Sequence, residues 1–368
     1  MDSAESAGAT ETVPRPLSRN ALLARGALLV GIVSGVVGAF AYVGGWFTPH
    51  ELTGARIIDT FERLSGPQPG FRRNHAKGVG LSGFFESNGR GAALSKASVF
   101  APGRVPVIGR FASGGGLPEA ADTANNVRSL ALLFQLPGGE EWRTGMNDIP
   151  VFPVNTAQAF HELLLTSLPD PATGKPNPSN MPAFLDRNPA SAKALQLIKS
   201  APKSSGFEND SYNSLNAFLF VNASGVVTPV RWAMVPAQPL ESAKPPPTAP
   251  LGKDYLFDAL VAAVARQPLQ FRLLLTVGRS GDSTSDATLP WPAERAVIDA
   301  GTLTVERVLD EAEAGVRDIN FDPLILPDGM RGSDDPLLSA RSLAYSASFT
   351  RREGEPKKPS AFAAKGGN

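Results

Sequence analysis

The hydrophobic residues of this chain follow two patterns, which separate an N-terminal segment from the rest. Residues 26–49 carry no charge, and three arginines stand just before them in residues 15–25. About 20 apolar residues suffice to cross a bilayer as a helix. We therefore expect a disordered tail over residues 1–20 and a transmembrane or signal-anchor helix over residues 21–48.

Two other interpretations of this apolar segment stay open. Ala39-Phe40-Ala41 fits the small-x-small pattern at which a signal peptide is cleaved. A long apolar run is also typical of a buried core helix. If the segment stays in the membrane, the arginines before it hold the N-terminus inside. We then expect anchoring in the inner (cytoplasmic) membrane with the following domain on the exported, periplasmic side; cleavage would leave that domain soluble there.

After a helical period over residues 50–66, the pattern changes at about residue 71 to short apolar runs between glycine-rich turns, which is typical of antiparallel strands. The clearest predicted strands are Val127–Leu136, Asn216–Val221, Val230–Val235 and Leu269–Val277. Residues 252–265 predict a second helix, and the proline-rich stretches 168–189 and 238–250 predict a long loop and an extended linker. The pattern indicates an α+β domain over residues 50–352, followed by a disordered tail over residues 353–368.

Composition excludes several kinds of functional site. The chain has no cysteine, which rules out thiol nucleophiles, thiolate metal sites, iron–sulfur clusters and disulfides. Histidine occurs only at His50, His75 and His161, so we expect no metal site built from several histidines. Lys plus Arg and Asp plus Glu both number 35, and the formal net charge is +0. This balance argues against nucleic acid as a partner.

One chemically informative spacing lies near the C-terminus, in DPLLSARSLAYSASFTRR. Tyr345 follows Arg341 by four residues and Arg352 follows it by eleven, so a helix of about 3.6 residues per turn carries all three on one face. Neighbouring cations favour an ionised phenol, and a bound ferric ion favours it much more. The stripe would suit a tyrosinate ligand for iron, but the spacing alone favours a surface helix with a tyrosine packed against arginine stems.

Four blocks of the sequence resemble the catalase family, in the order in which that family has them. Residues 71–86 (FRRNHAKGVGLSGFFE) resemble the motif in which an arginine stands three residues before a histidine that is followed by Ala-Lys-Gly. The other blocks are the strand pair 109–136, the asparagine segment 145–154 (GMNDIPVFPV), and FDP at 321–323 with the Arg341–Tyr345 spacing. The resemblance covers about residues 55–352.

The resemblance implies a catalase-like antiparallel β-barrel with helical insertions around a buried haem b. It implies that His75 is the distal acid–base group, that Asn147 is the distal hydrogen-bond donor and that Tyr345 is the axial iron ligand. The other implied haem contacts are Arg341 as the cationic partner of the tyrosine, Phe160 on the distal side, and Arg72, Arg110 and Arg352 near the propionates or the tyrosine. Outside this context, a single histidine is more often a core residue, and Asn-Asp before an apolar run is ordinary turn chemistry.

The sequence departs from the family at one position and in length. Catalases usually carry a serine just after the Arg-Phe of the second block, where it supports the distal histidine, but this chain has Ala112 there and Ser113 next to it. Either the histidine loses one orienting hydrogen bond, or a one-residue bulge brings Ser113 into the role. The chain is also shorter than common catalases and lacks the parts that tie their tetramer together, so we expect a monomer or dimer.

The leading hypothesis is a haem peroxidase that reduces hydrogen peroxide or organic peroxides with a small organic reductant, has weaker catalase activity, and is held at a membrane by its N-terminal helix. Two alternatives stay open. One is a hydroperoxide isomerase or lyase that acts on lipid hydroperoxides. The other is a haem-binding protein without turnover.

Overall fold

The computed structural model describes residues 18–43, 52–238, 251–312 and 315–362. The chain divides into two compact units, Met1–Glu51 and Leu52–Asn368. In the first unit the described structure is one helix, α1 (Arg19–Val43). The second unit contains all the other described elements and every residue of the predicted site.

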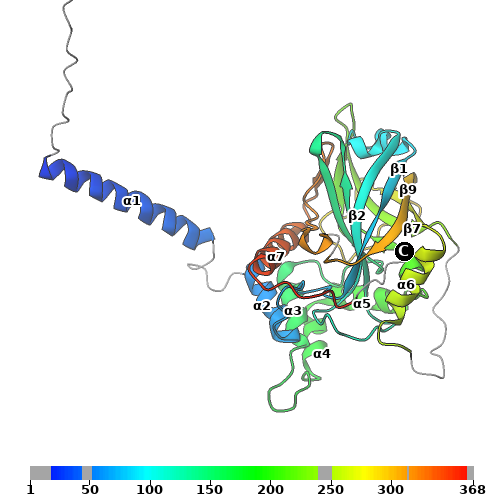
Figure 1. The fold of residues 1–368 in the computed structure, drawn as a ribbon, viewed down its shortest axis with the longest axis horizontal. Helices are drawn as coiled ribbons and strands as arrows, with labels where there is room; N and C mark the ends of the chain where they lie inside the picture. Colours follow the sequence, from blue (N-terminus) through cyan, green and yellow to red (C-terminus); the bar gives the residue numbers. More distant parts are fainter. Residues whose placement is uncertain (1–17, 44–51, 239–250, 313–314, 363–368) are drawn as a thin grey trace, which may run out of the picture. The chain divides into compact units, whose positions relative to one another are not determined.

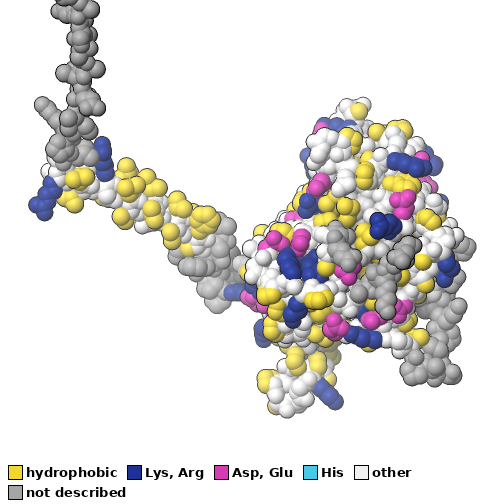
Figure 2. All heavy atoms as spheres, viewed as in Figure 1, with side chains coloured by type: hydrophobic (Ala, Val, Ile, Leu, Met, Phe, Trp, Pro, Cys, Tyr) yellow, Lys and Arg dark blue, Asp and Glu magenta, His cyan; other side chains and the backbone are white. Residues whose placement is uncertain are grey.

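The predicted apolar helix is confirmed as α1, and its residues 44–48 lie outside the described part of the chain. Hydrophobic side chains cover α1 along its length (Figure 2), with Leu28 exposed by 65% and Phe40 by 75%. The mean hydropathy of Arg19–Tyr42 is 1.9. This helix is long and apolar enough to cross a membrane, and a signal sequence meets the same criteria.

One antiparallel sheet forms the centre of the second unit. Its strands are β1 (Gly78–Ser87), β2 (Gly103–Ser113), β3 (Arg128–Gln135), β4 (Glu141–Asn147), β5 (Tyr212–Asn213), β6 (Phe218–Val221), β7 (Val227–Pro236), β8 (Leu269–Val277), β9 (Val297–Leu309) and β10 (Met330–Gly332). They follow the order β10-β6-β7-β5-β4-β3-β2-β1-β9-β8. A further pairing of β7 with β8 closes the strands into an eight-stranded barrel (Figure 1), while β6 and β10 continue the sheet beyond β7.

Helices lie outside this barrel. They are α2 (Gly54–Ser65), α3 (Ala157–Thr166), α4 (Asn180–Arg187), α5 (Pro189–Ser200), α6 (Tyr255–Arg266) and α7 (Pro336–Glu353). Short 3₁₀ helices occur at Arg90–Ala93, Ser98–Phe100, Pro137–Gly139, Phe207–Asn209 and Val316–Asp318. Helices α2, α3 and α7 lie together beside the barrel, and α6 lies apart from them (Figure 1).

The barrel interior is filled by every second residue of its strands. In β8 the alternating residues Leu269, Phe271, Leu273 and Leu275 are buried, as the sequence pattern predicts. Inside the barrel, Trp142 stacks on Phe134 with ring centroids 4.5 Å apart. Because one face of each strand packs into the barrel interior, the opposite face of β2, β3 and β4 points outward and is available to form a site.

Two expectations about the connecting segments differ from the structure. The predicted loop 168–189 contains helix α4, in which Pro182 lies in the first turn, where a missing backbone N–H costs little. The expected tail 353–368 is ordered up to residue 362, because Glu355 pairs with Arg73 and Phe362 packs on Phe257 with ring centroids 5.4 Å apart. The predicted linker 239–250 lies outside the described residues.

Candidate active site

A single cavity of about 480 Å³ brings together all eight residues that the sequence singles out. It is lined by the outward face of β2–β4 and by residues of α2, α3 and α7. The eight lining residues in question are Arg72, His75, Arg110, Asn147, Phe160, Arg341, Tyr345 and Arg352. Residues that are up to 280 positions apart in the sequence therefore face one space.

Two rows of residues across β2, β3 and β4 form the strand side of the cavity. One row pairs Arg110 with Ala131 and Ala131 with Gly145. The other row pairs Ala112 with Ser129 and Ser129 with Asn147. Directly opposed residues of antiparallel strands have neighbouring side chains on one face. Beyond Arg110 the first row contains only the small residues Ala131 and Gly145. The sheet surface next to Tyr345 is therefore flat.

Gly145 marks the closest approach of this surface to α7. A Cβ atom at this position would lie 3.2 Å from the Tyr345 hydroxyl oxygen and 3.6 Å from Nη2 of Arg341. The backbone carbonyl of Gly145 accepts a hydrogen bond of 3.0 Å from Arg341 Nη2. A side chain at position 145 would therefore occupy the space in front of the phenol.

His75 lies in the loop before β1 in an unusual backbone conformation. Its φ of 54° is left-handed, which is uncommon for a residue other than glycine. The side-chain oxygen of Asn74 accepts hydrogen bonds from the backbone N–H groups of His75 (3.0 Å) and Gly115 (2.9 Å), and Arg110 Nη1 donates to the His75 carbonyl (3.0 Å). The backbone of this residue is therefore fixed independently of its ring.

The three residues after His75 are each required by a different part of the fold. Ala76 is buried and bonds to Gly115 through its backbone. The buried Lys77 ammonium pairs with Asp122 at 2.7 Å. A Cβ atom at Gly78 would overlap the guanidinium of Arg110, so only glycine leaves room for that side chain. The Ala-Lys-Gly sequence therefore positions the loop that carries the histidine.

The hydrogen-bond partner of the His75 ring is neither Ala112 nor Ser113. Nδ1 of His75 lies 3.1 Å from the hydroxyl oxygen of Ser129, on β3. The Ser113 hydroxyl is buried with no hydrogen-bond partner among the described residues. Both alternatives that the sequence left open are therefore wrong, and no pattern in the sequence pointed to position 129, 54 residues away.

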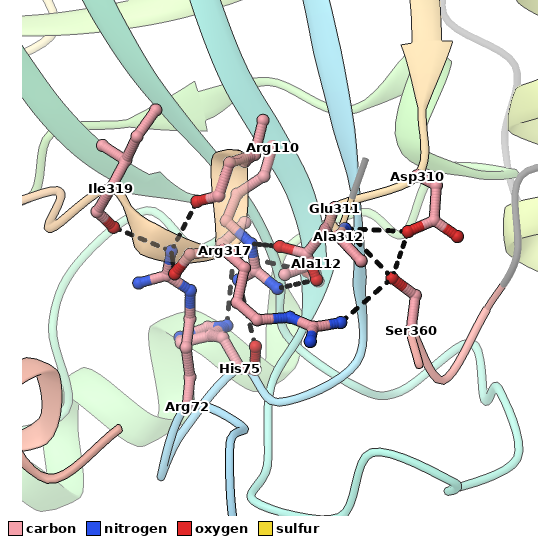
Figure 3. Close-up of polar contacts among 12 residues, drawn as sticks. Arg72, His75, Arg110, Ala112, Asp310, Glu311, Ala312, Arg317, Ile319 and Ser360 are labelled. Carbon is pink, nitrogen blue, oxygen red and sulfur yellow. Dashed lines mark hydrogen bonds and ion pairs between the residues drawn. The ribbon is translucent and has the colours of Figure 1, made fainter. Parts of the chain in front are cut away.

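Buried arginines surround the histidine loop (Figure 3). Arg110 forms a paired contact with Glu311, Nε–Oε1 at 2.6 Å and Nη2–Oε2 at 3.1 Å, in addition to its bond to His75. Arg72 donates to three backbone carbonyls, those of Val316, Arg317 and Ile319. Glu311 was missed by the sequence reading, because a carboxylate 201 residues from its partner leaves no local signal.

The tyrosine lies on α7, as its spacing predicts. Asp335 caps this helix, accepting a 2.9 Å hydrogen bond from the Leu337 N–H, and Pro336 occupies its first turn. Asp335 also accepts a 2.8 Å bond from the amide of Asn216, whose oxygen in turn accepts from Arg341. The same carboxylate that begins the helix therefore also orients Arg341, through Asn216.

The charges around the cavity disfavour a protonated histidine. Burial is the largest cause that lowers the pKa of His75, to about 3, and three cations add to the shift: Arg110, Arg341 and Arg72. The ordinary value near 6.5 therefore does not apply to this ring in the protein alone. His75 is neutral at any physiological pH and is able to accept a proton.

The two remaining residues of interest lie on α3. The Phe160 ring lines the cavity, with its centroid 5.6 Å from that of Phe152 and 6.0 Å from that of Phe61. His161 points elsewhere, and its Nε2 lies 3.0 Å from the Thr60 hydroxyl of α2. The third histidine, His50, lies outside the described residues.

Comparison with known proteins identifies the family. The family model described as Catalase matches residues 49–358. The chain belongs to the catalase family. Among its relatives in this family is a catalase-related peroxidase of Synechococcus elongatus, 32% identical over 306 residues, which are 83% of this chain and 90% of the relative. A second catalase-related peroxidase, from Mycolicibacterium paratuberculosis, is 31% identical over 82% of this chain and 96% of its own length.

Solved catalases have the same fold. A fungal catalase superposes with a TM-score of 0.69 at 19% identity, over 81% of this chain and 62% of the other. Catalase A from Saccharomyces cerevisiae gives a TM-score of 0.68 at 19% identity, over 81% and 64% of the two chains. The predicted α+β fold, a catalase-like antiparallel barrel with helices, is therefore confirmed.

The catalase family implies a haem, and the cavity offers the features that such a group requires. Among the described residues, the Tyr345 hydroxyl has no hydrogen-bond partner, which leaves its oxygen available as a ligand. Arg352 is buried and its Nε has no partner in the described part of the chain. Burial is the main cause that lowers the pKa of Arg72 well below its ordinary value and that of Arg352 to about 10. A partly buried cation, Arg72, and a buried one, Arg352, neither of them paired with a carboxylate among the described residues, fit a flat apolar group that carries two carboxylates.

Proposed function

We propose that this protein is a haem b peroxidase that reduces hydrogen peroxide or organic peroxides with a small organic electron donor and has weak catalase activity. The observation that carries the proposal is one largely apolar cavity that joins the Tyr345 phenol, which has no hydrogen-bond partner among the described residues, with a neutral imidazole, His75. The catalase-related peroxidases to which the chain is similar over most of their length support it.

In this proposal, the residues of α7 and the buried cations bind the cofactor. Tyr345 would bind the iron through its phenol oxygen, with Arg341 as its cationic neighbour on the same helix. Arg72 and Arg352 bind the propionates, while Arg110, which Glu311 already neutralises, mainly fixes the loop of His75. Phe160 packs against the porphyrin. Haem held by these residues would supply the redox chemistry of the reaction with peroxide.

The chain's own part in the reaction is to move one proton. Neutral His75 would accept the proton of one peroxide oxygen and return it to the other oxygen, which leaves as water. Asn147 stands beside Ser129 in the strand row, and its amide forms no hydrogen bond to any described residue. We assign this amide the role of donor to the departing oxygen. Propionates between Arg72 and Arg352 would offset part of the positive charge that lowers the pKa of His75.

The N-terminal helix is the basis for a proposal about where the protein is located. Arg19 and Arg25 lie in the first two turns of α1, and positive charge is retained on the cytoplasmic side of a membrane. We therefore propose that residues 21–48 anchor the protein in the inner membrane and that the haem domain, residues 50–352, faces the periplasm. Protease added to intact spheroplasts would then degrade the haem domain. Protection of the domain in intact spheroplasts, with degradation only after lysis, would contradict this topology.

The test of the function is a purified full-length protein made with ample haem supply. We expect a haem absorption spectrum, donor oxidation that depends on hydrogen peroxide, and slower release of oxygen without a donor. Colourless protein would contradict the haem proposal. Donor-free turnover of a fatty acid hydroperoxide would favour the isomerase or lyase alternative, and bound haem with no turnover of any peroxide would favour the non-catalytic one.

A further inference from the structure

The contact between Ser129 and His75 has a chemical direction that can be worked out from a second contact. The Ser129 hydroxyl oxygen lies 3.1 Å from His75 Nδ1, and it donates to the backbone carbonyl of Ala112 at 3.3 Å. A hydroxyl has one hydrogen to donate and two lone pairs. Because a carbonyl can only accept, the serine hydrogen is used by Ala112. The oxygen of Ser129 therefore accepts from His75, whose Nδ1 carries the ring proton.

This direction determines which nitrogen of His75 is the base. A neutral imidazole carries one proton, so protonation of Nδ1 leaves Nε2 with a free lone pair. Nε2 forms no hydrogen bond to any of the residues that the structure describes. His75 lines the cavity, so the unprotonated nitrogen is the one available to a peroxide there.

The strand row makes Ser129 a rigid support. Ser129 is 8% exposed, lies in β3 and is directly opposed by Ala112 on β2 and Asn147 on β4. Other contacts of His75 hold its backbone, through Asn74 and Arg110, and leave ring rotation free. Among the described residues, Ser129 is the only side chain that bonds to the ring.

We propose that Ser129 is the positioning residue of this active site, which fixes the imidazole of His75 with Nδ1 protonated and Nε2 free as the proton acceptor. It replaces, from the adjacent strand, the hydroxyl that position 112 lacks. This inference rests on the proposed peroxidase function. It also links the two groups of the proton transfer, because the residue that orients His75 is the immediate neighbour of Asn147.

The first experiment needs no variant. Full-length protein with reduced haem and bound carbon monoxide is diamagnetic, and ¹⁵N-labelled histidine at only three positions gives a simple long-range ¹H–¹⁵N spectrum. We expect the His75 signals of an Nδ1-protonated tautomer. The opposite tautomer would overturn the proposal even if peroxide turnover is normal. Loss of turnover with the expected tautomer would count against the proposed function instead.

The second experiment moves the hydroxyl across the strand pair. Ser129→Ala should keep haem but react with peroxide about 10- to 100-fold more slowly, a smaller loss than the roughly 10²–10⁴-fold expected for removal of the acid–base group itself, and its His75 should show a mixture of tautomers. Ser129→Thr, which keeps the hydroxyl, should stay within about threefold of wild type. Adding Ala112→Ser to Ser129→Ala should recover part of the rate, because the two positions are directly opposed.

A matched control is the neighbouring buried serine. Ser113 has no hydrogen-bond partner for its hydroxyl among the described residues, so Ser113→Ala should leave both the rate and the tautomer unchanged. An equal loss of rate in Ser113→Ala and Ser129→Ala would show a general effect of packing and would reject the positioning role. An unchanged rate and tautomer in Ser129→Ala would reject it as well.

Discussion

The two regions that meet in the cavity are built in opposite ways. On one side, helix α7 carries Arg341, Tyr345 and Arg352 along a single stretch of chain. On the other, the histidine cluster (Asn74, His75, Ser129 and Asn147) is assembled from a loop and two strands. The helix positions its groups by local geometry, whereas the cluster depends on sheet register. If the proposed roles hold, ligand binding and proton transfer depend on different kinds of sequence information in this fold.

The largest expected effect follows from removing the proposed iron ligand on α7. Tyr345→Phe deletes the oxygen that we propose binds iron, so we expect haem occupancy to fall to almost nothing, read from the haem absorption of purified protein. Ser346→Ala is the matched control, because Ser346 is exposed on the same helix. Normal haem content and spectrum in Tyr345→Phe would show that the helix does not supply the ligand.

The next effect separates the two regions. His75→Ala should keep its haem, because the binding groups lie elsewhere, but its rate of reaction with hydrogen peroxide should fall by about 10²–10⁴-fold, the range for a lost acid–base group. His161→Ala, whose ring contacts Thr60, serves as the control. A rate within threefold of wild type would contradict the role of His75.

A smaller effect concerns how the stability of the protein depends on pH, because burial and nearby arginines lower the pKa of His75. The pKa of His75 is about 3 in the folded protein and near 6.5 when unfolded. The unfolded state therefore binds more protons between these values, and stability falls as pH falls from about 6.5 towards 3. Between pH 7 and pH 4.5, haem-free wild type should lose about 2 kcal/mol more stability than His75→Gln, measured by urea unfolding. Equal losses would show that the ring is not held neutral. Asp148, whose pKa burial raises to about 6, titrates in both proteins, so its contribution cancels.

The smallest effect tests the ordered end of the chain. Glu355 binds the side chain of Arg73 and the backbone of Gly70, next to the histidine cluster. Glu355→Gln keeps the size but not the charge and should cost about 1 kcal/mol, seen as a lower Tm. Glu353→Gln is the control, because in the described part of the chain Glu353 pairs only with the exposed Lys357. The same loss of Tm in both variants would mean that the segment after α7 does not stabilise the loop.

The elements that the sequence predicted well are those with a local period. β8 has the predicted bounds, Leu269–Val277, because its alternation needs no partner to be recognised. The stripe on α7 follows likewise from helical spacing. Helix α4 was missed because its Pro182, read as a loop residue, sits in the first turn, where proline is tolerated.

The missing parts of the site are partners that lie far apart in the sequence. Ser129, Glu311 and Asn216 hold His75, Arg110 and Arg341 across 54, 201 and 125 residues. Which serine reaches a ring depends on the register of β3 against β2, and nothing in the composition of either strand fixes that register. The resemblance pointed to position 112, whereas the directly opposed residue bears the hydroxyl.

The short sequence after His75 has a consequence for protein engineering. Ala76 needs the backbone of Gly115, Lys77 needs Asp122, and Gly78 makes room for Arg110. If residues 75–78 were grafted into another protein without those distant contacts, they would not reproduce the left-handed backbone conformation of His75. The motif is useful for recognising relatives by sequence. To reproduce its conformation in a designed protein, the rest of the barrel must be included as well.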